Sequence, residues 1–308
     1  MIFSRKRIGL ALGGGGARGI AHIGILRVFE KEGIPIDLIV GTSIGALVGG
    51  AFASGINTHR MEELIHSFLD SPAFRNSAIK SIRDIHSCKK LSVAQKIQAF
   101  FKNRYFVAQA LFRIGMLQHE DFQAMVDYFL PDIQIQECPI KFCAVATDLV
   151  SGQAVVLSEG PIRRAVMASC AVPGAVPPVE YDGKLLSDGG IVYLVPTTVA
   201  REQGAGFVIG VSVNTELVSG QEFRSAMDIY VRSTEIMGYH LERCRLMDAN
   251  VVLRPNVGRL HWTEFDLADD LISEGMKVAN ENLHLIKKAI PLYRRWKKGK
   301  VVDRAKAS

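Results

Sequence analysis

The chain has 308 residues, 48% of them hydrophobic and 22% charged, with a formal net charge of +6. This length accommodates one large α/β domain or two smaller ones, and the hydrophobic content excludes wholesale disorder. The five cysteines are scattered without CxxC or Cys/His spacing, which argues against a metal site and favours reduced thiols and a cytoplasmic protein. Cys170 lies in an apolar segment and is expected to be a small core residue.

The chain opens with two short apolar segments separated by a helical pattern. Residues 7–12 predict a buried strand, residues 17–32 a helix that ends at Gly33, and residues 36–40 a second buried strand. Two continuous apolar strands joined through a helix form a right-handed unit with parallel strands. Their carboxyl ends therefore meet at one edge of the sheet, where open α/β sheets bind ligands.

A glycine stretch follows the first strand and a glycine-flanked serine follows the second. Residues 13–19 read GGGGARG, and Ser43 lies between Gly41 and Gly45 in the segment GTSIG, before a helix expected to run to about residue 54. The two flanking glycines permit a sharp strand-to-helix turn that exposes the serine hydroxyl. The glycine stretch offers closely spaced backbone N–H groups that can bind an oxyanion. Together these loops indicate acyl transfer with Ser43 as nucleophile.

The glycine stretch also fits two nucleotide-binding patterns in part. Gly14, Gly16 and Gly19 satisfy G-x-G-x-x-G, but the acidic ribose ligand should close the second strand, where Gly41 stands instead. A P-loop requires Gly-Lys-Ser/Thr, and Ile20 follows Gly19. We therefore expect no nucleotide cofactor.

Residues 58–130 carry a mostly helical pattern and are expected to form an insertion in the α/β domain. Within them, residues 96–115 mix aromatic and basic side chains. Such a segment is either a lid or interfacial helix at a lipid surface or, more commonly, an ordinary core-facing helix. The sequence leaves both interpretations open.

The remaining pattern alternates strands and helices without a linker or repeat. Strands are predicted at 140–146, 154–157, 184–187, 207–213 and 251–253, and helices at 160–169, 196–203, 222–247 and 266–290. We expect one domain over 1–290 and a basic tail over 291–308. The tail suits an anionic membrane surface or serves only solubility, and no apolar stretch is long enough for a spanning helix.

A second acid–base candidate closes the strand predicted at 184–187. Asp188 is followed by two glycines, and if this strand joins the same parallel sheet, Asp188 reaches the edge where Ser43 lies. Aspartate is a weak base near neutral pH, so burial must raise its pKa or the two groups must be tightly coupled. An isolated Asp-Gly-Gly is more often a solvent-facing turn.

Histidine is the more usual base for a serine nucleophile. His22 falls in the first helix near the glycine loop and is expected to be packed there. Three histidines follow Asp188 in the chain order of α/β-hydrolase triads, at positions 240, 261 and 284, but none comes after a clear strand at a loop. A Ser43–Asp188 dyad is the favoured interpretation.

These blocks together resemble the patatin-like phospholipases, close to the bacterial members that are similar to the catalytic domain of neuropathy target esterase. The family pairs Gly-Gly-Gly-x-Arg/Lys-Gly with Gly-x-Ser-x-Gly and a later Asp-Gly-Gly/Ala. Residues 14–19, 41–45 and 188–190 match these motifs in order, and residues 168–173 look like the segment that precedes the family's aspartate. The likeness extends over residues 7 to about 213.

The resemblance implies a three-layer α/β/α patatin-like fold with a mostly parallel central sheet. It also implies that Asp188 is the general base for Ser43, and that the backbone N–H groups of Gly14, Gly15 and Gly16 form the oxyanion hole. Arg18 would either fix that loop or contact a lipid phosphate.

The expected activity is hydrolysis of carboxylic esters in phospholipids or lysophospholipids through an acyl-enzyme. We expect no metal or organic cofactor, no nucleic acid partner, and peripheral contact with an anionic membrane, on the inner face. An acyltransferase or thioesterase using the same dyad remains an alternative, and so does a non-catalytic lipid-binding module.

Overall fold

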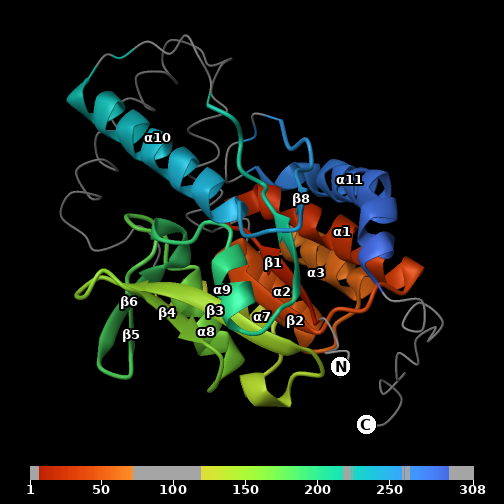
Figure 1. The fold of residues 1–308 in the computed structure, drawn as a ribbon. Coiled ribbons are helices and arrows are strands. Elements are labelled where there is room, and N and C mark those ends of the chain that lie inside the picture. The colour runs from red at the N-terminus through yellow and green to blue at the C-terminus, as the bar shows by residue number, and fades with distance from the viewer. Residues whose placement is uncertain are drawn as a thin grey trace.

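A mixed β-sheet with helices on both faces forms the centre of the molecule in the computed structural model (Figure 1). The structure describes residues 7–71, 119–217, 223, 225–258, 260 and 264–290. The segment 96–115, expected to be interfacial or core-facing, and the basic tail 291–308 lie outside these residues.

The described part of the sheet has eight strands in the spatial order β5-β6-β3-β2-β1-β7-β8, with β4 pairing on β3. The strands are β1 (Ile8–Leu12), β2 (Leu38–Thr42), β3 (Lys141–Asp148), β4 (Ala154–Leu157), β5 (Val179–Tyr181), β6 (Lys184–Asp188), β7 (Phe207–Val211) and β8 (Val251–Leu253). Neighbours within the group β3-β2-β1-β7-β8 are parallel, whereas β4, β5 and β6 pair antiparallel. The parallel part was predicted, and the antiparallel edge was not.

Helices connect and cover these strands. They are α1 (Ala21–Glu32), α2 (Ile44–Ala53), α3 (Thr58–Asp70), α7 (His119–Phe129), α8 (Ile162–Ser169), α9 (Thr197–Glu202), α10 (Ala226–Leu246) and α11 (Ala268–Ala289), with short 3-10 turns η1 (Gly16–Ile20), η2 (Ile135–Glu137), η3 (Gly189–Ile191) and η4 (Phe265–Leu267). Helices α3 and α7 are the described ends of the region expected to be a helical insertion. None of the described helices is long and apolar enough to span a membrane.

Two hydrophobic clusters lie on opposite faces of the sheet. Leu10 and Leu12 of β1 point into the larger cluster, which holds the buried side chains of α1, α2, α8 and α11. Ala11 points into the smaller cluster with Val199 of α9 and Leu246 of α10. Because both faces are covered, the central parallel strands are buried along their whole length, as their continuous apolar sequence predicts. The three-layer α/β/α arrangement is confirmed.

Helices α1 and α11 pack with backbones in close approach. A Cβ atom on Gly24 would lie 1.9 Å from the carbonyl oxygen of Ile272, and one on Gly275 would lie 2.0 Å from that of Ala21. Neither position therefore accepts a side chain without separating the helices. This contact ties the C-terminal helix to the helix that follows the glycine loop.

Candidate active site

Ser43 occupies a strained turn between β2 and α2. Its backbone has φ 55° and ψ −128°, a region that non-glycine residues rarely adopt and that costs roughly 1–3 kcal/mol. The turn closes because its neighbours lack side chains: a Cβ on Gly41 would lie 2.4 Å from the carbonyl oxygen of Gly45. A Cβ on Gly45 would lie 2.2 Å from that of Leu12. Ser43 itself is buried, at 8% exposed.

Ser169 holds the strained turn from the side. The Ser43 N–H donates to Ser169 Oγ at 3.0 Å, and the Ser169 hydroxyl donates to the carbonyl oxygen of Val145 at 2.6 Å. Both bonds are buried, so loss of the hydroxyl would leave two backbone groups without this partner. No role was predicted for Ser169 from the sequence; the one indication was that residues 168–173 resemble a segment of the family.

The glycine loop lies directly against the nucleophile. A Cβ on Gly14 would be 3.2 Å from the Cβ of Ser43, so a side chain at this position would crowd the nucleophile. The Gly14 N–H donates to the carbonyl oxygen of Leu194 at 2.9 Å, and the Gly13 N–H donates to that of Val211 at 3.0 Å. In this conformation the Gly14 amide is therefore engaged within the fold, unlike the expectation that it faces an oxyanion.

The next amides of the loop begin a helical turn. Gly15 is the N-cap of η1 and Gly16 is its first residue. The first N–H groups of a helix have no acceptor within that helix, and they carry partial positive charge. Gly15 and Gly16 thus present the donors of the loop that are suited to a negatively charged oxygen.

Arg18 stabilises the glycine loop through a hydrogen bond to its backbone. Its Nε donates to the carbonyl oxygen of Gly15 at 3.0 Å, and its Nη1 reaches Thr215 Oγ1 at 3.4 Å. Burial lowers the pKa of Arg18, and the nearby negative charge of Glu242 raises it. Glu242 also accepts from Asn214 Nδ2 at 3.0 Å. Of the two roles that the sequence left open for Arg18, this conformation shows the loop-fixing one.

His22 also stabilises the glycine loop through a contact with its backbone. Its Nε2 lies 2.8 Å from the carbonyl oxygen of Gly13, and its side chain is fully buried. Burial lowers the pKa of His22 to about 4, so the ring is neutral at pH 7 and Nε2 donates the proton. As packed, His22 positions the glycine loop.

Asp188 reaches Ser43 on a strand of the opposite direction to the one expected. Strand β6 is antiparallel to β3, and Asp188 pairs with Ala146, while Val145 pairs with Thr42 of β2. Strand β6 begins beyond the carboxyl ends of the parallel strands and runs in the opposite direction to them. Its last residue, Asp188, therefore lies near the end of β2, where Ser43 follows. Its backbone is fixed, since the Asp188 N–H donates to the Ala171 carbonyl oxygen at 2.9 Å.

The Asp188 carboxyl is a buried group of shifted acidity. Burial raises its pKa to about 6, against a hydrogen-bonding interaction with Ser43 and a bond from the Gly190 N–H, both of which lower it. Oδ1 accepts the Gly190 N–H at 2.7 Å. Oδ2 is buried and makes no hydrogen bond of ordinary geometry within the described residues. Ser43 therefore lies near the Asp188 carboxyl group, and Oδ2 of that group has no hydrogen bond to the described residues.

Cys170 also lies near Ser43 and Asp188, a position that the sequence did not predict. Its thiol interacts with the Ser43 side chain, and burial and the charge of Asp188 raise its pKa well above the usual range. Cys170 is thus a neutral thiol lining the site, half-buried, and not only the small core residue that its apolar neighbours suggested.

A model of the patatin-like phospholipase family matches residues 10–201, from β1 through α9. The chain belongs to the patatin-like phospholipase family. The match contains the glycine loop, the Ser43 turn and Asp188, and it ends before β7, α10, β8 and α11.

Curated relatives of this patatin-like protein include members related to neuropathy target esterase. An uncharacterized NTE family protein of Mycobacterium bovis is 35% identical over 68% of this chain and 50% of its own length. Lysophospholipase NTE1 of Scheffersomyces stipitis is 27% identical over 91% of this chain and 18% of its own length. The chain therefore spans about half or less of the length of these relatives.

Among solved structures, VipD from Legionella pneumophila is similar with a TM-score of 0.46 and 14% identity, over 92% of this chain and 67% of that one.

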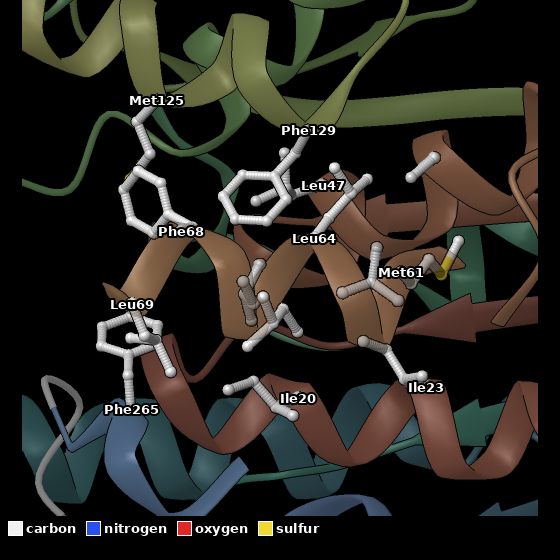
Figure 2. A pocket seen from close by; sticks show the side chains of 14 residues that line it. Ile20, Ile23, Leu47, Met61, Leu64, Phe68, Leu69, Met125, Phe129 and Phe265 are labelled. Atoms are coloured by element: carbon white, nitrogen blue, oxygen red, sulfur yellow. The ribbon is translucent and has the colours of Figure 1, made fainter. Parts of the chain in front are cut away.

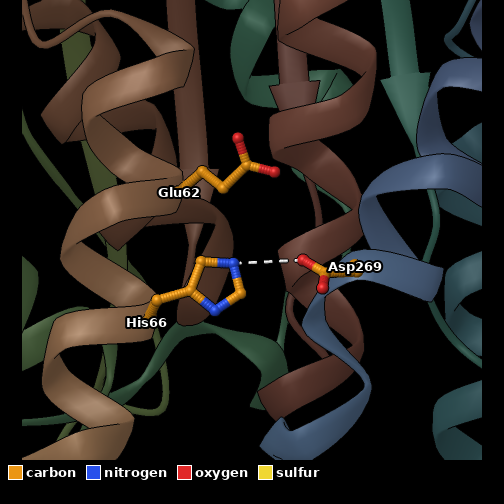
Figure 3. A group of neighbouring side chains, drawn as sticks. All are labelled: Glu62, His66 and Asp269. Carbon is orange, nitrogen blue, oxygen red and sulfur yellow. Dashed lines mark ion pairs between the residues drawn. The ribbon is translucent and has the colours of Figure 1, made fainter.

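One cluster of metal-ligating residue types lies on α3 and α11 (Figure 3). The ligand atoms of Glu62, His66 and Asp269 all lie within 4.8 Å of one another, and His66 Nε2 is 3.1 Å from Asp269 Oδ1. Arg27 Nη2 already contacts Glu62 Oε2 at 2.8 Å. Glu62 is half-buried and the other two side chains are exposed, and polar contacts of this kind account for the cluster.

Proposed function

We propose that this patatin-like protein hydrolyses carboxylic esters of phospholipids or lysophospholipids through a Ser43–Asp188 dyad. One observation carries the proposal: a serine in a strained glycine-flanked turn, a buried carboxyl and a helix-starting glycine loop converge at one edge of the sheet. A serine hydroxyl needs a base to become nucleophilic, and the carboxyl group that interacts with Ser43 is that of Asp188.

In the first step, Ser43 Oγ attacks the acyl carbonyl carbon while Asp188 Oδ2 accepts the hydroxyl proton. The tetrahedral intermediate collapses as Asp188 returns this proton to the leaving alcohol, which leaves an acyl-Ser43 ester. Water then attacks that ester, its proton passes to Asp188, and collapse releases the fatty acid and restores the Ser43 hydroxyl. Every proton taken by Asp188 is returned, so the cycle needs no other reactant.

The negative oxygen of both intermediates requires donors next to Ser43. The N–H groups of Gly15 and Gly16 at the start of η1 are suited to this role, and so is that of Ile44 at the start of α2. Arg18 and His22 hold the loop that carries the first two donors. Gly14 contributes by its lack of a side chain, which lets the loop approach Ser43.

Labelling with a fluorophosphonate probe and a lysophospholipid hydrolysis assay test the proposal. The probe should modify Ser43 and Ser43→Ala should lose both labelling and hydrolysis. Ser67→Ala, an exposed serine on α3, is the matched control and should retain both. Retention of hydrolysis by folded Ser43→Ala would overturn the assignment. Transfer of the acyl group to added glycerol in place of water would identify an acyltransferase.

A further inference from the structure

An apolar cavity of about 90 Å³ lies between α1, α2, α3 and α7, and Figure 2 shows its lining side chains. All 14 lining residues are hydrophobic, and none carries a charge or a hydrogen-bonding side chain. The rings of Phe68 and Phe129 meet at one wall with their centroids 5.2 Å apart. A cavity of this composition accepts a hydrocarbon and rejects a polar headgroup, because a buried polar group without a partner is costly.

The cavity begins beside the nucleophile. Ile44, the residue after Ser43, lines it, and the lining continues along α2 through Leu47 and Val48 to Ala51. At 1.5 Å per residue, these seven steps extend roughly 10 Å along the helix axis. Ile20, the last residue of the turn η1 that the glycine loop starts, lines the same cavity. The two elements that flank the reacting carbonyl in the proposed mechanism thus both continue into this apolar space.

The side chains that line the cavity differ in burial. Ile44, Phe68 and Phe265 are half-buried, whereas Ala51 and Met61 are only 5% and 4% exposed. Figure 2 shows Phe68, Leu69 and Phe265 toward one end and Met61 with Ile23 toward the other. Ala51 and Met61 thus belong to the buried part of the lining, and Ile44 belongs to its more exposed part.

We infer that this cavity binds the acyl chain of the substrate, with the ester carbonyl at Ser43 and the methyl end directed toward Ala51 and Met61. The inference rests on the proposed function and adds where the chain binds and which residues limit its length. The volume is below the roughly 150 Å³ of an apolar cavity that binds benzene, so only a few carbons fit without movement. Longer chains require Met61 and Met125 to repack, which their flexible side chains allow.

Ala51→Leu tests the part of the cavity that lies farthest from Ser43 along α2, by filling it. The measured quantity is the ratio of kcat/KM for p-nitrophenyl decanoate to that for p-nitrophenyl butyrate. Because each buried methylene contributes roughly fourfold, loss of space for two to three carbons should lower this ratio roughly fifteen- to sixtyfold. Leu64→Ala, which enlarges the cavity, should raise the ratio. Ala200→Leu is the matched control: this buried alanine lies in the cluster on the other face of the sheet, and its ratio should stay at the parent value.

Binding of decanoate to Ser43→Ala protein, measured by calorimetry, tests the cavity without catalysis. Adding Ala51→Leu to that protein should weaken binding at least tenfold, and adding Ala200→Leu should not. An unchanged ester ratio and unchanged binding in the folded Ala51→Leu proteins, verified by thermal unfolding, would overturn the inference. Failure of the proposed function looks different: the parent would hydrolyse neither ester, while the binding experiment would still decide where the chain lies.

Discussion

The two halves of the candidate site are built in different ways. Ser43 and the glycine loop come from one contiguous unit, β1 through α2, in which parallel strands and short turns set the geometry. Asp188 comes from an antiparallel strand more than a hundred residues later, and its backbone is held by Ala171 and Thr147. The nucleophile half therefore depends on local backbone conformation, and the base half depends on long-range strand pairing and burial.

The largest effect is expected when the basic carboxylate of Asp188 is replaced by a neutral group of the same shape. Asp188→Asn should lower kcat/KM for a lysophospholipid by roughly 10³- to 10⁴-fold, since a neutral amide cannot accept the Ser43 proton. Steady-state kinetics on Ser43→Ala, Asp188→Asn and the double variant measure this. The double variant should be no worse than Ser43→Ala, because the two residues act as one unit. Additive losses would mean that Asp188 does not act through Ser43.

The glycine loop is the next target. A Cβ on Gly15 would lie 2.7 Å from Val213 Cγ2, so Gly15→Ala should displace the loop and its amide donors. We expect kcat to fall on the order of 10²-fold, the cost of a lost oxyanion donor. Gly33→Ala is the control at a left-handed helix end with open space around it. It should cost about 1 kcal/mol of stability and leave kcat unchanged; equal kcat values in both variants would remove the loop from the mechanism.

The base half has a distinctive pH signature. Burial raises the pKa of Asp188 to about 6 from 3.8, so kcat/KM should rise with pH through a midpoint near 6 and fall about tenfold per unit below it. Asp188→Asn should remove this midpoint from residual activity. A midpoint that persists in the variant would assign the titration to another group.

The same shift makes a stability prediction. The pKa of Asp188 is higher in the folded state than in the unfolded state, so its stabilising contribution is complete below pH 3.8. That contribution is lost as the pH rises through 6, because the buried carboxylate is then charged. Asp188→Asn should therefore gain roughly 3 kcal/mol over the parent at pH 8, and the difference should shrink toward pH 4. Urea unfolding at both pH values measures it.

Ser169, which supports the Ser43 turn, and Ser187, which precedes Asp188, provide a test with a smaller expected effect. Ser169→Ala leaves the Ser43 N–H without its partner and should cost roughly 1–3 kcal/mol of stability, with about a tenfold loss of kcat as the strained turn relaxes. Ser187→Ala removes a bond to the Ala171 carbonyl, which still accepts the Asp188 N–H. Its kcat should stay near the parent value. Equal kcat losses would show that the turn needs no support from Ser169.

The smallest effect is expected for membrane binding by the basic tail, residues 291–308, which lies outside the described residues. Replacing Arg294, Arg295, Lys297 and Lys298 with glutamine should weaken sedimentation with anionic vesicles by roughly fivefold for each side chain that reaches the surface. Binding should also weaken as salt rises. Salt-independent binding, or binding unchanged by the substitutions, would mean that the tail serves only solubility.

Three features could be predicted from the amino-acid sequence: the parallel centre of the sheet, the glycine-flanked turn at Ser43, and the position of Asp188 at the end of a strand. These features follow from local rules, because apolar runs predict strands and only glycine allows the close contacts of the turn. The motif order also indicated the family, which the match over residues 10–201 confirmed.

Other features became clear only from the tertiary structure. They include the direction of β6 and the hydrogen bond from the Ser43 N–H to Ser169. They also include the hydrogen bond from the Gly14 N–H to Leu194 and the position of Cys170 near Ser43. The tertiary structure also decided that Arg18 holds the loop. Each of these depends on groups far apart in the chain, whose pairing is set by how the whole chain buries its surface and satisfies its hydrogen bonds. No local pattern encodes that choice.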